Sequence, residues 1–168
     1  MKYFFFATAL LGVFPAVILL LASRRFVRWG TLGLLLPLLL FNETAINFLS
    51  HETYRGTSRG MEISIIYLVA LVLLLTFFLG RKPMKFFPDT GSLFYLAYFL
   101  CSIPSVFNAA NGLFSFFELW KMFMIYLVFL AVYNYLEYSD GDFDIFLYGI
   151  AAVVAINFFV IVKQHFHG

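Results

Sequence analysis

The chain has 168 residues, of which 63% are hydrophobic, 21% are aromatic and only 12% are charged. An ordinary soluble domain has about 25% charged residues, and 11 basic plus 9 acidic side chains are too few to cover a soluble surface of this size. The composition predicts a membrane protein and argues against a soluble, disordered or disulfide-stapled chain, since there is one cysteine. The net charge of +2 is too small for a nucleic-acid-binding surface.

Six apolar runs separated by polar residues are long enough to be transmembrane helices, because a hydrocarbon core about 30 Å thick needs about 20 helical residues. The runs are residues 3–22, 29–48, 63–79, 92–107, 117–136 and 143–162. They are continuous, whereas the strands of a membrane barrel alternate apolar and polar residues. We therefore predict an all-α, polytopic bundle of about six transmembrane helices, with residues 1–168 forming one transmembrane domain.

Two of these runs contain residues that disturb a helix in lipid. The second reaches its full length only by including Glu43, which is expected at the membrane surface or facing other helices. The fourth contains Pro104, which removes a helical hydrogen bond and predicts a kink or an early end near Ser102.

The basic residues of the short loops predict the orientation of the chain. Cytoplasmic loops carry an excess of Lys and Arg, and the first and third loops hold Arg24, Arg25, Arg28, Arg81, Lys82 and Lys85. We expect these two loops to be cytoplasmic, which places the N-terminus and the loops at 50–61 and 108–115 outside. The fifth loop opposes this assignment, because it holds four acids and no basic residue.

The loop at 50–61 concentrates polar residues in a chain that has few of them. Arg55 and Arg59 lie among glycines and hydroxyl residues, and guanidinium groups bind phosphate oxygens bidentately. One interpretation is a site for a phosphate or pyrophosphate group. The other is a solvated loop in which Arg59 and Glu62 flank the start of the third run.

Glu118 and Lys121 lie three residues apart at the start of the fifth run, so they can pair on one helix face. An internal ion pair or a lysine reaching toward the membrane surface explains them; an anionic substrate is the alternative. In the predicted orientation Arg55, Arg59 and Lys121 all lie on the outer side, which favours a shared site.

No recognisable metal, nucleotide or nucleophile motif is present. Asp140, Asp142 and Asp144 resemble the opening of a calcium loop, but the sixth position is Ile145 instead of glycine. These acids are better suited to the N-terminus of the sixth run, through the helix dipole. We expect no cofactor and no metal, and no catalytic residue can be named.

Two motifs resemble the N-terminal part of the bacterial O-antigen ligase and O-antigen polymerase-like family of membrane glycan-assembly proteins. They are NF at residues 47–48 followed by YRGTSRGMEI at 54–63, and FFELWK at 116–121. The resemblance implies a multi-pass protein of the bacterial inner membrane that handles glycans carried on undecaprenyl pyrophosphate in polysaccharide assembly. It also implies that Arg55, Arg59 and Lys121 contact the lipid-linked pyrophosphate.

In that family the catalytic arginine and histidine lie mainly on a large loop of the C-terminal half. We therefore expect this chain to correspond to an N-terminal membrane portion, inactive alone, that is a truncated copy, a fragment or one half of a split protein. Its expected partners are the bilayer, a lipid-linked glycan and, for a split protein, a separately encoded C-terminal half. The alternative is a small non-enzymatic membrane protein, such as a scaffold or transporter subunit. A secondary transporter would have inverted repeats and broken helices, and Pro104 is the one sequence feature that supports this function.

Overall fold

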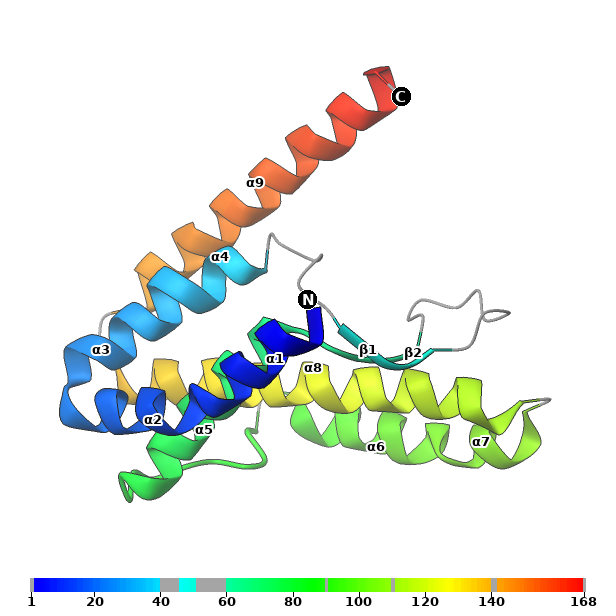
Figure 1. Cartoon of the computed structure of the whole chain (residues 1–168), viewed down its shortest axis with the longest axis horizontal. Helices are drawn as coiled ribbons and strands as arrows, with labels where there is room; N and C mark the ends of the chain where they lie inside the picture. The colour runs from blue at the N-terminus through cyan, green and yellow to red at the C-terminus, as the bar shows by residue number, and fades with distance from the viewer. Residues whose placement is uncertain are drawn as a thin grey trace.

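The computed structural model describes residues 2–39, 46–50, 60–89, 91–109, 111–139 and 142–167, and they are mostly helical (Figure 1). The all-α prediction is confirmed, with one small two-stranded hairpin added. In chain order the elements are α1 (Lys2–Leu11), α2 (Val13–Ala22), α3 (Arg24–Arg28), the π-helix η1 (Trp29–Leu35), α4 (Leu36–Leu38), β1 (Ile46–Ser50), β2 (Gly60–Ile63), α5 (Ile65–Leu79), α6 (Ser92–Ser102), α7 (Pro104–Asn108), α8 (Gly112–Tyr138) and α9 (Phe143–His167).

The second predicted run, residues 29–48, is wrong at residues 46–48. The helix made of α3, η1 and α4 ends at Leu38, and Ile46–Ser50 forms strand β1; Glu43 lies outside the described residues. β1 pairs antiparallel with β2 in the register Ile46↔Ile63 and Ser50↔Gly60. By pairing, the two strands satisfy each other's backbone N–H and C=O groups, which a helix would satisfy internally. A run of apolar residues does not by itself indicate such a pairing.

The break predicted at the proline of the fourth run is confirmed. α6 ends at Ser102 and α7 begins at Pro104, which occupies the first helical turn, where a missing N–H is tolerated. The Ile103 N–H donates to the Leu100 carbonyl at 3.2 Å, a tight turn that joins the two helices.

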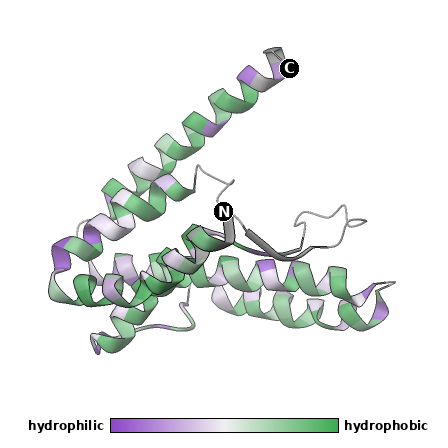
Figure 2. Ribbon diagram, viewed as in Figure 1, coloured by the Kyte–Doolittle hydropathy of each residue, from purple (hydrophilic) through white to green (hydrophobic). Residues whose placement is uncertain are grey.

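Two helices, α8 and Phe143–Lys163 of α9, are long and apolar enough to cross a membrane. Only 22% of the apolar stretch of α8 and 6% of that of α9 is buried within the chain, so most of each stretch is exposed among the described residues. The apolar helices Ala7–Ala22, Ile65–Leu79 and Ser92–Asn108 are shorter, about 22–26 Å at 1.5 Å per residue. Figure 2 shows apolar residues along the helices and hydrophilic ones mostly near their ends.

The core lies where α2, α5 and α8 pack together. Its buried members include Val17, Leu73, Phe77, Ala131 and Tyr135. The hydroxyl of the buried Thr76 is satisfied within its own helix, because it donates to the Val72 carbonyl at 2.7 Å.

α9 extends away from the core and contacts α4 (Figure 1). The contact depends on Gly149, because a Cβ there would lie 2.6 Å from Cδ1 of the buried Leu36. Small residues allow helices in a membrane to approach closely.

We expect Gly149→Leu to lower the free energy of unfolding by about 1–3 kcal/mol through overpacking, measured by thermal unfolding in detergent. Ala152→Leu, on an exposed position of the same helix, is the control; equal losses would contradict a close contact at Gly149.

Candidate functional site

The hairpin packs on the first half of α8, through a hydrogen bond from the indole of Trp120. Its Nε1–H donates to the Glu62 carbonyl of β2 at 3.1 Å. Gly60, the first residue of β2, has φ of 146°, a conformation that residues with a Cβ rarely adopt. The strand that follows the polar loop is therefore held against the helix that carries the FFELWK motif.

Of the three predicted site residues, the structure places one. Lys121 is half-buried, next to Trp120 in α8, and has an interaction partner, as does Glu118. Arg55 and Arg59 lie in residues 51–59, outside the described residues. Arg59 directly precedes Gly60 in the chain, so the structure links the strand that follows Arg59 to the helix of Lys121.

Trp120 is the residue of this site that the sequence analysis missed. Its neighbour Lys121 attracted attention because a lysine near an apolar run is costly. The indole N–H of Trp120 is the sequence feature that could have indicated this contact, because a buried tryptophan usually donates a hydrogen bond to an acceptor.

A second polar cluster lies at the opposite end of the core and connects the first loop to the start of α9. Arg28 Nη2 forms an ion pair with Asp142 Oδ1 at 2.9 Å. The hydroxyl of Tyr135, a residue that is 1% exposed, donates to Asp142 Oδ2 at 2.6 Å. Asp142 directly precedes α9, and its carbonyl accepts the Phe146 N–H at 2.9 Å, so one residue starts α9 and holds two other segments.

The third loop is attached to α8 in a similar way. The side chain of Asn134 accepts a hydrogen bond from the Lys85 N–H at 2.8 Å and donates to the Lys85 carbonyl at 3.1 Å. Lys85 Nζ also lies 2.8 Å from Glu137 Oε1. The hydrogen bond and charge of Glu137 raise the pKa of Lys85, and those of Lys85 lower the pKa of Glu137. The pair therefore persists at neutral pH; it is lost as the pH rises through the raised pKa of Lys85 or falls through the lowered pKa of Glu137.

These contacts explain the acids of the fifth loop, which seemed to oppose the predicted orientation. Glu137 pairs with Lys85 of the third loop, and Asp142 pairs with Arg28 of the first. The acids are partners of the basic residues and share their end of the molecule. Asp144 is exposed in the first turn of α9, where a negative charge favours the helix dipole, and Asp140 lies outside the described residues.

A strained residue at the end of α5 positions the third loop. Arg81 has φ of 52°, and its N–H donates to the Phe78 carbonyl at 3.2 Å while the Lys82 N–H donates to the Phe77 carbonyl at 3.1 Å. This is a Schellman cap, whose left-handed position glycine normally occupies.

We expect Arg81→Gly to raise the free energy of unfolding by about 0.5–1 kcal/mol, because the left-handed penalty outweighs the added chain entropy. Thermal unfolding in detergent measures the change. Lys163→Gly, in the last part of α9, is expected to be destabilising or neutral; a loss of stability in Arg81→Gly would contradict the strain.

No protein-family model, curated protein sequence or solved structure matches the chain. The relation to the O-antigen ligase-like family therefore stays a prediction that depends on the two motifs. One of these motifs now has a structural role, since its tryptophan holds β2.

Proposed function

We propose that this chain is a multi-pass protein of the bacterial inner membrane that binds the pyrophosphate of an undecaprenyl-linked glycan. The site would be the end of the bundle where the hairpin packs on α8. In this proposal the chain is the membrane portion of an O-antigen ligase or polymerase-like protein, and its partner is the lipid-linked glycan.

The observation that carries the proposal is the hydrogen bond from Trp120 to the Glu62 carbonyl. It brings the strand after Arg59 onto the helix that carries Lys121. Two guanidinium groups and an ammonium group are the donors that an oligophosphate requires, since each forms charge-assisted hydrogen bonds with its oxygens.

The multi-pass assignment is supported by exposed apolar surface. Large apolar side chains are exposed on the helices from α1 to α9, including Phe14, Phe94 and Phe159 at 79%, 80% and 69%. A water-soluble protein of this size rarely leaves so much apolar surface uncovered. The helices α1–α2, α5, α6–α7, α8 and α9 cover five of the six predicted runs, and α3–η1–α4 covers the start of the other.

The chemistry proposed for the assembled protein is glycosyl transfer. A hydroxyl of the acceptor attacks the anomeric carbon, and the bond to the lipid pyrophosphate breaks with the electron pair leaving on a phosphate oxygen. Arg55, Arg59 and Lys121 would hold the pyrophosphate and stabilise the charge that develops on it. The hydroxyl proton passes to a general base, which the resemblance places on the large loop of the family's C-terminal half.

Binding of undecaprenyl pyrophosphate to the purified chain in lipid nanodiscs tests the proposal. Arg55→Ala with Arg59→Ala is expected to weaken binding at least about tenfold, because each charge-assisted hydrogen bond contributes about 1.5–3 kcal/mol. Undecaprenol, which lacks the pyrophosphate, is expected to show no difference. Arg81→Ala with Lys163→Ala removes two positive charges elsewhere and serves as the control. Unchanged binding in Arg55→Ala with Arg59→Ala would contradict the proposal and favour the interpretation of a solvated loop.

The orientation is tested separately by reporter fusions. Fusions after Arg28 and after Lys85 are expected to report the cytoplasm, and a fusion near Gly56 the outside, because basic loops stay inside. The opposite pattern would remove the argument for a site on the outer side.

A non-enzymatic scaffold or transporter subunit is the second candidate, and the exposed surface of α9 favours it. Only 6% of the apolar stretch of this helix is buried in the chain, which leaves its sides open to another membrane protein. Absence of pyrophosphate-dependent binding in the nanodisc assay would favour this candidate.

A further inference from the structure

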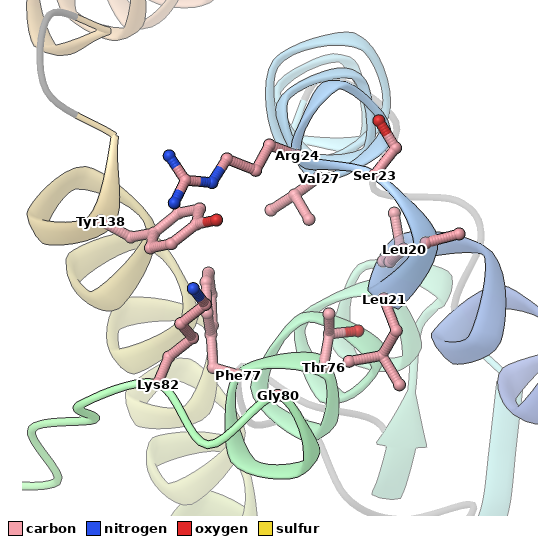
Figure 3. Close-up of a pocket in the computed structure, with 11 residues that line it drawn as sticks. Leu20, Leu21, Ser23, Arg24, Val27, Thr76, Phe77, Gly80, Lys82 and Tyr138 are labelled. Atoms are coloured by element: carbon pink, nitrogen blue, oxygen red, sulfur yellow. The ribbon is translucent and has the colours of Figure 1, made fainter.

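At the predicted cytoplasmic end, a cavity of about 260 Å³ opens between the first and third loops, where α2, α5 and α8 end (Figure 3). A second cavity of about 500 Å³ adjoins it, and Arg24 and Tyr138 line both. Neither is part of the hairpin site, which lies at the other end of the core. We refer to the two together as the basic cavity.

Two cations share one aromatic ring in the basic cavity. The guanidinium carbon of Arg24 lies 5.4 Å from the centre of the Tyr138 ring, and Lys82 Nζ lies 5.1 Å from it. Figure 3 shows Arg24 and Lys82 approaching the ring from opposite sides. Among the described residues neither forms an ion pair with a carboxylate. Two positive charges beside one ring, with no described carboxylate as their partner, favour the binding of an anion.

The only described carboxylate that lines the basic cavity belongs to Asp142, and it is already engaged by Arg28 and Tyr135. The described lining thus holds one carboxylate against four cations: Arg24, Arg25, Arg28 and Lys82. After the pair of Arg28 and Asp142 is set aside, three positive charges face the cavity.

The inner wall of the same cavity is apolar. It is formed by side chains at the ends of α2 and α5 and in α3, namely Leu20, Leu21, Val27 and Phe77. Positive charge beside an apolar wall, at the level where the helices end, matches the boundary between the head groups and the acyl chains of a bilayer. Basic pockets between transmembrane helices at this level bind anionic lipid head groups.

We propose that the basic cavity binds the phosphate group of an anionic phospholipid, with Arg24 and Lys82 as its ligands, Tyr138 as the surface that orients them, and the glycerol and first methylene groups against the apolar wall. Inorganic phosphate offers the same charged oxygens without the apolar part. A bound lipid would tie the first loop to the third and hold both against the end of α8.

Native mass spectrometry of the full chain in detergent, titrated with phosphatidylglycerol or phosphatidylcholine, tests this site. The chain is expected to bind phosphatidylglycerol at least about tenfold more tightly, and Arg24→Gln with Lys82→Gln to remove that preference. Arg24→Lys with Lys82→Arg preserves both charges and is expected to retain most of it. Lys2→Gln with Lys163→Gln, near the two ends of the chain, is the control of equal charge change and is expected to bind like the unaltered chain.

Three outcomes would overturn the proposal. They are an undiminished preference in Arg24→Gln with Lys82→Gln, an equal loss in the control pair, and complete displacement of phosphatidylglycerol by an equimolar amount of inorganic phosphate, which would make the site one for free phosphate. Circular dichroism verifies that the variants keep their helices. Lys82→Gln alone, in a loop after α5, provides a milder variant whose unchanged preference would count equally against the site.

Discussion

Replacing Asp142 with alanine is expected to lower the free energy of unfolding by about 2–4 kcal/mol, measured by thermal unfolding in detergent. The buried hydroxyl of Tyr135 would lose its acceptor, at a cost of about 1–3 kcal/mol. Arg28 would lose its ion pair; because that side chain is 51% exposed, we assign about 0.5–1 kcal/mol to this contact. Since Asp142 also precedes α9, the start of that helix is expected to loosen first.

Asp144→Ala is the matched control, because Asp144 is exposed two residues away and carries the same charge. Its loss is expected to be about 0.5 kcal/mol, from the helix dipole alone. A double-mutant cycle of Asp142→Ala with Arg28→Ala isolates the ion pair from the tyrosine contact. Equal losses at Asp142 and Asp144 would show that the contacts of Asp142 contribute nothing to stability.

The second large effect is expected at Asn134, which is 4% exposed. Asn134→Leu removes the partner of both the N–H and the carbonyl of Lys85, at an expected cost of about 2–3 kcal/mol, because part-buried backbone groups are left unpaired. The third loop is expected to detach from α8. Protection of the Lys85 amide against hydrogen exchange measures this detachment directly.

Asn157→Leu is the control for this substitution. Within the part of the chain that the structure describes, the side chain of Asn157 donates only to the Val153 carbonyl of its own helix, at 3.1 Å. Because a helical carbonyl keeps its backbone partner without that bond, we expect a change of about 0.5 kcal/mol or less. Unaltered protection of the Lys85 amide in Asn134→Leu would contradict the attachment of this loop to α8.

The helices were predictable from the sequence because each needs only a local property, a continuous run of apolar residues. Pro104 marked its break correctly for the same reason, since a missing N–H acts within one helical turn. The second run failed at Ile46–Ser50, where strand pairing joins residues ten or more positions apart. Apolar strands and apolar helices have similar composition, and only the partner distinguishes them.

The candidate sites also have some features that the sequence predicts and others that only the structure shows. The sequence by itself determined that the chain is rich in apolar helices, that basic residues collect in the first and third loops, and that Arg55, Arg59 and Lys121 are its candidates for binding an anionic lipid. Counting residue types along the chain suffices for these conclusions, because hydropathy and charge belong to each residue alone.

Only the tertiary structure decided which charges compensate one another. Asp142 and Glu137 looked like an unpaired acidic loop in the sequence, and they prove to be partners of Arg28 and Lys85 from loops more than 50 residues away. Arg24 and Lys82 looked equivalent to those bases, and among the described residues they meet over the ring of Tyr138 without a carboxylate. The packing of α2, α5 and α8 sets these distances, and the strength of an electrostatic contact depends on distance and burial in space, which the order of residues does not specify.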